Sequence, residues 1–416
     1  MKKILLLVCL CLTAVAASAD VTSSTGHRYT TFTGVDYVFM FNGITTSSNE
    51  IEYTGTGTDV KWYKFTDTNK TNFISNQTSI PPEDATGYTL VVDGKETTIW
   101  VIDYSKYLPT LTPISALDNA DKCSYVDLLI NAKIPTLSYQ TPGGLTKPIT
   151  RNFEITYTTL SWGGTQWVDS TATVKLTSPT MPTTETVKVP YKATTFTLSG
   201  DQYATDLGII VTPAVSNLYT FLAVICHETS VVVTRNATNE AERPTSAKQV
   251  SGSAPLDMTF YSNPNDPVLY YNWQIFKDKS KTSLISGRIE KTTPYTFDEA
   301  GSYVVAVTVS NATCSYSDSI TVTVSTSSIE APNVFTPNGD GHNDEFRVAY
   351  KSIIQFDAWV YNRWGRLVYK WSDPMKGWDG NIGGKKAAAG AYFYVIKAVG
   401  ADGKKYKLKG DINLLR

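Results

Sequence analysis

Short runs in which apolar and polar residues alternate cover most of the chain. Within residues 320–325, for example, Ile, Val and Val alternate with Thr, Thr and Ser. Such alternation places one face of a strand on a core and the other in water. Gly, Pro, Asn and Asp separate the runs, and beyond the N-terminal segment no long stretch has the 3.6-residue period of a helix. The pattern predicts an all-β chain of tandem immunoglobulin-like β-sandwiches that ends in a small C-terminal β-sandwich.

Three connecting stretches divide the chain into pieces of about one sandwich each. They cover residues 109–113, 235–254 and 325–332, and are rich in Pro or in small polar residues. A chain of 416 residues has room for several domains of this size. We therefore predict four domains, at residues 20–108, 118–235, 250–326 and 331–416.

Aromatic residues recur at similar places in these pieces. Trp62 and Trp273 each lie within an apolar run that predicts a central strand, and Tyr88 and Tyr303 each follow a glycine that opens a later strand. A tyrosine at such a corner of a sandwich can hydrogen-bond back to the backbone. We expect these residues to form the core, and we expect the apolar segment 37–43 to be a core strand rather than an adhesive edge.

The N-terminal residues have the features of a secretory signal peptide. Lys2 and Lys3 precede an apolar run over residues 4–15, and the small residues 17–19 form a cleavage site. The run is too short for a transmembrane anchor, which needs about 20 apolar residues. Residues 1–19 are therefore predicted to be removed on export.

Three cysteines remain after this cleavage, in a compartment where disulfides persist. Cys123 opens an early strand of the second piece and Cys226 follows a late one. We predict a Cys123–Cys226 disulfide that stabilises the second sandwich. Cys314 would then be the odd thiol, either inert or a link between two chains.

Composition argues against several classes of function. Lys and Arg number 37 and Asp and Glu 38, a balance that does not suit a nucleic-acid-binding protein. Aromatic residues make up 12% of the chain, which disfavours disorder. There are three histidines, and the chain lacks a His-Glu-x-x-His motif, a Gly-x-Ser-x-Gly elbow and a phosphate-binding loop. We expect no enzyme and no catalytic residues, with a paired-carboxylate carbohydrate-active enzyme as an alternative.

Charge is distributed unevenly along the chain. Residues 331–416 hold 14 Lys and Arg against 8 Asp and Glu, whereas the rest holds 23 against 30. Lys405, Lys407 and Lys409 alternate along the last predicted strand, so they share one face of it. Two interpretations stay open: the lysines keep an edge strand from pairing with another chain, or they meet an acidic partner.

The C-terminal piece contains a series of short motifs rich in Gly, Asn and aromatic residues. They stand at residues 333–344 (NVFTPNGDGHND), 361–365 (YNRWG), 377–380 (GWDG) and 390–394 (GAYFY), followed by the terminal segment 409–416. In order, spacing and position they resemble the gliding-motility-associated C-terminal domain, the type B sorting domain of the Bacteroidota type IX secretion system. The matching motif residues are Asn338, Gly339, Asp340, Gly341, Asn343, Asp344, Asn362, Arg363, Trp364, Gly365, Gly377, Trp378, Asp379, Gly380, Gly390, Tyr392, Tyr394 and Arg416.

The resemblance implies a route and partners. The chain would cross the periplasm and the outer membrane through the type IX translocon, aided by a SprF-like outer-membrane protein, and reach the cell surface or the medium. Residues 250–326 resemble a PKD domain through segments 273–276 (WQIF) and 297–305 (FDEAGSYVV). We expect the upstream sandwiches to be adhesive modules for a protein or glycan ligand. The alternative is an accessory component of type IX secretion or envelope signalling.

One motif carries candidate metal ligands. Asn338, Asp340, Asn343 and Asp344 place side-chain oxygens close together in sequence, as calcium loops do. An EF-hand is excluded because Ala349 stands where its twelfth-position glutamate would be. The other interpretation is a turn whose side chains bond to the backbone. Apart from calcium, no cofactor is expected.

Overall fold

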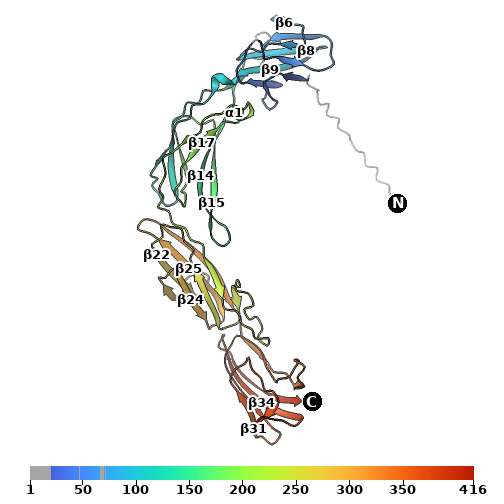
Figure 1. The fold of residues 1–416 in the computed structure, drawn as a ribbon, viewed down its shortest axis with the longest axis vertical. Coiled ribbons are helices and arrows are strands. Elements are labelled where there is room, and N and C mark those ends of the chain that lie inside the picture. Colours follow the sequence, from blue (N-terminus) through green and yellow to red (C-terminus); the bar gives the residue numbers. More distant parts are fainter. Residues whose placement is uncertain (1–19, 46, 66–69, 71) are drawn as a thin grey trace, which may run out of the picture. The chain divides into compact units, whose positions relative to one another are not determined.

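The computed structural model describes residues 20–45, 47–65, 70 and 72–416, so the predicted signal peptide lies outside the described residues. The described part is almost entirely β-structure, as Figure 1 shows, and the all-β prediction is confirmed. Its helices are η1 (Tyr104–Tyr107), a 3-10 turn, and α1 (Gln202–Asp206). Among these described residues, no helix combines the length and apolarity needed to cross a bilayer. The chain divides into two compact units, residues up to 159 with 169–220, and residues 160–168 with 221–416.

The first sandwich has a three-stranded sheet ordered β1-β4-β7 and a six-stranded sheet ordered β2-β3-β9-β8-β5-β6. Its strands are β1 (Val21–Ser23), β2 (His27–Tyr29), β3 (Tyr37–Phe41), β4 (Ile51–Tyr53), β5 (Val60–Lys64), β6 (Phe73–Ser75), β7 (Ser79–Ile80), β8 (Thr86–Val92) and β9 (Lys95–Asp103). Asp93 and Gly94 both have positive φ, 48° and 79°, and form the tight turn between β8 and β9.

Every residue of β3 is buried, which confirms that this apolar segment is a core strand. Phe39 and its same-face neighbours fill the core between the two sheets. Val38 and Met40, on the opposite face, join a second apolar cluster that includes Leu137 and Tyr203 of the next sandwich. The uninterrupted apolar sequence of β3 follows from this burial on both faces.

The expected tryptophan and tyrosine contacts are present. Trp62 and Trp273 are fully buried, and their indole nitrogens donate to the carbonyl oxygens of Gln77 (3.0 Å) and Glu290 (2.8 Å). The Tyr303 hydroxyl donates to the carbonyl oxygen of a residue four positions earlier at 2.7 Å. The Tyr88 hydroxyl accepts from a backbone N–H five positions earlier at 2.9 Å. Both tyrosines therefore fix a corner of their sandwich, as predicted.

The second sandwich packs a sheet ordered β10-β11-β16 against one ordered β15-β14-β17-β18, with β12 and β13 as a separate hairpin. Its strands are β10 (Ser115–Leu117), β11 (Tyr125–Ile130), β12 (Ser138–Gln140), β13 (Thr146–Pro148), β14 (Asn152–Trp162), β15 (Trp167–Thr177), β16 (Thr183–Lys188), β17 (Thr197–Gly200) and β18 (Ala214–Val215).

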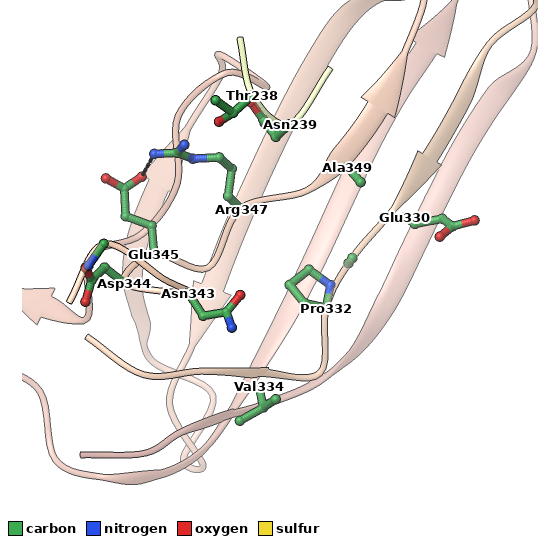
Figure 2. Close-up of a pocket in the computed structure, with 12 residues that line it drawn as sticks. Thr238, Asn239, Glu330, Pro332, Val334, Asn343, Asp344, Glu345, Arg347 and Ala349 are labelled. Carbon is green, nitrogen blue, oxygen red and sulfur yellow. Dashed lines mark hydrogen bonds and ion pairs between the residues drawn. The ribbon is translucent and has the colours of Figure 1, made fainter. Parts of the chain in front are cut away.

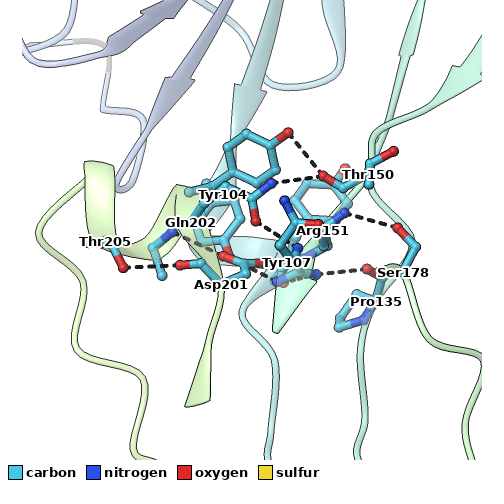
Figure 3. A network of polar contacts seen from close by, with 12 residues as sticks. Tyr104, Tyr107, Pro135, Thr150, Arg151, Ser178, Asp201, Gln202 and Thr205 are labelled. Atoms are coloured by element: carbon cyan, nitrogen blue, oxygen red, sulfur yellow. Dashed lines mark hydrogen bonds and ion pairs between the residues drawn. The ribbon is translucent and has the colours of Figure 1, made fainter. Parts of the chain in front are cut away.

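A buried polar cluster joins the first two sandwiches (Figure 3). Arg151 and Asp201, 2% and 1% exposed, form an ion pair through the arginine Nε. The hydroxyl of Tyr104, from η1 of the first sandwich, donates to Asp201 and accepts from Arg151 Nη2 at 2.8 Å. The second terminal nitrogen, Nη1, donates to the carbonyl oxygens of Tyr107 and Pro135, both at 2.9 Å. The guanidinium is thus well satisfied without water.

The third sandwich has a sheet ordered β19-β21-β24 and a five-stranded sheet ordered β20-β26-β25-β22-β23. Its strands are β19 (Thr229–Val232), β20 (Ser251–Gly252), β21 (Leu256–Tyr261), β22 (Tyr270–Phe276), β23 (Leu284–Arg288), β24 (Thr292–Phe297), β25 (Gly301–Ser310) and β26 (Ser315–Val324). The predicted end of the second sandwich at residue 235 is wrong, since β19 pairs with β21 of the third.

The predicted disulfide between Cys123 and Cys226 is also wrong. Cys226 is a free thiol, 2% exposed, and forms an isolated bridge with Pro264 of the third sandwich. It therefore belongs to a different domain from Cys123. Burial raises the pKa of the Cys226 thiol to about 12, which keeps it protonated and unreactive. Cys123 and Cys314 are each in a disulfide, so Cys314 is not the odd thiol.

The C-terminal domain is built on a five-stranded sheet ordered β28-β35-β34-β30-β31, with two small two-stranded sheets, β27-β29 and β32-β33. Its strands are β27 (Ser328–Glu330), β28 (Val334–Phe335), β29 (Ala349–Lys351), β30 (Ile353–Tyr361), β31 (Leu367–Trp371), β32 (Asn381–Ile382), β33 (Lys385–Lys386), β34 (Gly390–Gly400) and β35 (Lys405–Leu414).

Part of the segment predicted as a linker at residues 235–254 lies against this domain. The Asn239 side-chain amide donates to the carbonyl oxygens of Val348 (2.9 Å) and Pro374 (2.8 Å). The backbone N–H of Ala241 donates to the Tyr350 carbonyl oxygen at 2.8 Å. Polar residues that suggested a flexible connection therefore satisfy the backbone of the neighbouring domain.

Candidate functional site

The C-terminal domain is the part of the chain with the most sequence motifs, and most of their side chains are structural. Trp378 is fully buried, with its indole N–H bonded to the Asn381 carbonyl oxygen at 2.8 Å. Its ring lies 4.9 Å from that of Tyr392 and 5.4 Å from that of Phe335. Aromatic residues from three separate motifs therefore meet in one core.

The motif at residues 338–344 forms a loop closed by its own acidic side chains. The two carboxylate oxygens of Asp344 accept the backbone N–H groups of Gly339 (2.7 Å) and Gly341 (2.8 Å). Asp340 accepts from the side-chain amide of Asn338 and from the His342 N–H. These two bonds hold the pKa of the Asp340 carboxyl below its usual range.

This arrangement favours the turn interpretation of the loop over the calcium interpretation. All four carboxylate oxygens of Asp340 and Asp344 already accept N–H bonds. The Asn343 backbone carbonyl, rather than its side chain, accepts the Thr336 N–H at 2.8 Å. A calcium ion would have to displace these donors from the carboxylates.

We expect Asp344→Ala to destabilise the C-terminal domain by about 1 kcal/mol, because two backbone N–H groups lose their acceptor. We also expect added Ca²⁺ to leave the melting temperature of the full chain unchanged. Thermal unfolding with and without Ca²⁺ measures both effects, and Asp344→Asn, which keeps one acceptor oxygen, is the matched control. A calcium-dependent rise in melting temperature that Asp344→Ala abolishes would establish the calcium site.

The motif at residues 362–365 is a turn between β30 and β31. The Asn362 side-chain oxygen accepts the backbone N–H groups of Trp364 and Arg366, both at 3.0 Å. Trp364 is 75% exposed, and the Arg363 guanidinium lies 4.3 Å from the centroid of its ring. Within the described residues, no hydrogen bond joins this turn to the 338–344 loop.

The remaining motif residues bring the C-terminus against the core. Gly380 has a φ of 74°, and an added Cβ would lie 3.1 Å from side-chain atoms of Leu414 and Pro337. Its carbonyl oxygen accepts from Arg416 Nη2 at 2.9 Å. Asp379 closes its own turn by accepting the Asn381 backbone N–H at 2.9 Å.

The glycine and tyrosine motif opens β34. The Tyr392 hydroxyl donates to the Ala388 carbonyl oxygen at 2.9 Å, four residues earlier, as Tyr303 does in the third sandwich. Tyr394 packs on the same core, 5.3 Å from the Phe346 ring. The remaining motif glycines, Gly377 and Gly390, flank Trp378 and Tyr392 in sequence.

A surface pocket of about 660 Å³ lies beside the 338–344 loop (Figure 2). Asn343 and Asp344 form one wall of the pocket. Asn239, from the segment at residues 235–254, forms another. Inside it, Arg347 Nη2 donates to Glu345 at 2.7 Å, while the buried Arg347 Nε has no hydrogen-bond partner in the described part of the chain. Sequence motifs located the loop, but no local pattern in the sequence indicated that residues near 239 complete the pocket.

The fold and this domain define a chain of tandem β-sandwiches that ends in a compact module bearing sorting-domain motifs. Residues 329–414 match the family model described as CHU_C Type IX secretion signal domain, and residues 115–216 match the fibronectin type III domain model. The chain therefore carries a type IX secretion signal domain at its C-terminus and a fibronectin type III-like domain upstream, as expected of a type IX cargo protein. A type IX secretion system accordingly handles its export.

Solved structures of other multidomain proteins are similar to this chain at low scores. A tetra-tandem repeat from the extending region of a large adhesion protein is 13% identical, covering 91% of this chain and 98% of that one, with a TM-score of 0.21. Sidekick-1 immunoglobulin domains 1–5 are 13% identical over 88% of this chain and 74% of that one, at 0.23. Dimeric latent PorU from Porphyromonas gingivalis is 11% identical, and the match covers 77% of this chain and 35% of that one, with a TM-score of 0.17. Comparison with curated proteins finds no match.

Proposed function

We propose that this chain is a non-enzymatic, modular binding protein that the type IX secretion system delivers to the cell surface. Residues 329–416 are the address, which a SprF-like outer-membrane protein receives, and the upstream sandwiches are adhesive modules for a protein or glycan ligand. The observation that carries the proposal is the match of the C-terminal domain to a type IX secretion signal, on a domain with its own buried core.

An exposed strand edge in the third sandwich supports the binding role. Strand β23 ends the five-stranded sheet, so one side of its backbone has no neighbouring strand among the residues that the structure describes. Leu284 and Ile285 on this strand are 53% and 42% exposed, and Ile289 just beyond it is 81% exposed. Apolar side chains along an open edge suit an extended partner that adds a strand.

Deleting residues 329–416 is expected to trap the rest of the chain in the periplasm. The predicted signal peptide would still direct passage through the inner membrane, but the outer-membrane step would lose its signal. Immunoblots of medium, surface and periplasm measure the outcome in a host with a type IX system. As the matched control, residues 221–416 attached to the signal peptide and a reporter should carry that reporter out of the cell.

Two results would contradict the proposal in different ways. Release of the truncated chain into the medium would show that residues 329–416 are not the export signal. A null strain that no longer exports other type IX proteins would assign the chain to the secretion machinery. Normal export of those proteins, combined with weaker attachment of the null strain to protein- or glycan-coated surfaces, is the result we expect.

A further inference from the structure

The C-terminal sheet has one face on the core and one face in solvent, which we call the outer face. Core residues such as Ala358 and Ile396 alternate with outer-face residues along β30 and β34. Register places Lys370, Trp359, Val395 and Lys409 in one row across β31, β30, β34 and β35. The row has an apolar centre with a lysine at each end.

Two ammonium groups lie near the central tryptophan. Lys370 Nζ is 5.4 Å and Lys397 Nζ is 5.7 Å from the centroid of the Trp359 ring, within the range of cation–π attraction. Lys397 stands directly opposite Lys407 of β35. Among the described residues, none of these lysines, nor Lys409, forms an ion pair with a carboxylate. The outer face also holds Asp357, opposite Lys397, and Asp411, opposite Phe393. The four lysines outnumber these two carboxylates, so the face keeps an excess of positive charge.

Protection of an edge strand explains only part of this pattern. Strand β35 has β34 along its length and only the two-residue β28 on its other side, so Lys407 and Lys409 lie on a largely open edge. Strand β34, in contrast, is paired on both sides, with β30 and β35. Lys397 blocks no edge, because its strand is paired on both sides. Its cross-strand neighbour on β30 is Asp357, yet its ammonium group lies by the Trp359 ring.

We propose that the outer face is the surface by which the sorting domain docks onto an acidic protein surface of the outer-membrane type IX machinery, an inference that rests on the proposed function. Exposed aromatic and aliphatic groups at the centre, including Phe393 at 47%, with lysines around them, match the anatomy of a protein interface. To bind a phosphate-rich lipid or polysaccharide, the lysines alone would be enough, and the exposed apolar centre would have no role. The excess of 14 basic over 8 acidic residues in 331–416 steers the domain toward such a partner.

The test reverses two charges of the outer face in the full chain, Lys370→Glu with Lys397→Glu, in a host with a type IX system. The matched control is Lys385→Glu with Lys386→Glu, which makes the same charge change on exposed β33 of the same domain. We expect the outer-face variant to lower the secreted fraction about tenfold and the control to leave it unchanged. Thermal unfolding should show that both variants are folded, with a lower melting temperature for the outer-face variant because it loses two contacts with Trp359. Lys407→Glu with Lys409→Glu should repeat the export defect from the other end of the face.

Failure of this inference and failure of the proposed function give different results. If the outer-face variants are secreted normally while deletion of residues 329–416 blocks export, the docking surface is wrong and the address stands. If the deleted chain is also exported, the proposed function falls. Two further measurements test other occupants: sedimentation of the full chain with phosphatidylglycerol vesicles, and its self-association in sedimentation equilibrium. Binding in either that the outer-face variant abolishes would overturn the assignment to a protein partner.

Discussion

Replacing Asp201 with alanine is expected to lower the free energy of unfolding of the first compact unit by about 3–5 kcal/mol. The Arg151 guanidinium would stay 98% buried after losing its only ion-pair partner among the described residues. The Tyr104 hydroxyl and the Ala204 backbone N–H would lose the same acceptor. Burial is the largest cause that raises the pKa of Tyr104, and it opposes ionisation of this hydroxyl in the variant as well.

Differential scanning calorimetry of the full chain measures this effect as a lower temperature for one transition. The double variant Arg151→Met with Asp201→Ala removes both charges and should recover much of the loss, since an apolar replacement of a buried pair is often near neutral. Hydrogen exchange localises the change, which we expect in both sandwiches because Tyr104 belongs to the first. An Asp201→Ala variant within 1 kcal/mol of the natural chain would mean that water enters the cluster.

Much of the architecture could be predicted because a strand with one buried face has apolar residues at alternate positions. Trp62 and Trp273, within such runs, are both fully buried, and the corner tyrosines bond where expected. The Arg151–Asp201 ion pair could not be predicted from a local pattern, since the two residues are 50 positions apart and lie in ordinary turn sequences. Local pattern cannot show which distant charges meet.

Domain boundaries and the thiol pairing were misplaced for a related reason. Segment 235–254 has the composition of a linker, but its polar groups bond to the backbone of the C-terminal domain. Cys226 follows the last strands of the second sandwich in sequence but lies beside Pro264 in the third. In both cases the partner is set by tertiary packing, which composition does not encode.

The sorting motifs were found from sequence, but their roles were not. Glycine, asparagine and aspartate in the 338–344 loop suggested metal ligands, whereas their hydrogen bonds close the loop itself. The outer face gave a partial signal, because Lys405, Lys407 and Lys409 alternate on one strand. Trp359 and Lys397 join them only through strand register, which the sequence alone does not fix.

Replacing Trp378 with alanine is expected to destabilise the C-terminal domain by about 3–5 kcal/mol, the usual cost of deleting a buried aromatic side chain. The ring is fully buried between Tyr392, Phe335 and Tyr369, so its loss opens a cavity in the centre of the core. A domain of this size has a total stability of about 5–15 kcal/mol, so a large part of it is lost. We therefore expect the full-length Trp378→Ala chain to be retained in the periplasm, as the deletion is.

Trp364→Ala is the matched control, because it removes the same side chain from another sorting motif at a position that is 75% exposed. Its stability should change by less than about 0.5 kcal/mol. Thermal unfolding and the secreted fraction, measured for both variants, separate folding from recognition. If Trp364→Ala blocks export at unchanged stability, the exposed ring is itself read by the machinery. If Trp378→Ala unfolds the domain and export continues, the folded shape is not the signal, and a linear segment of residues 329–416 must be.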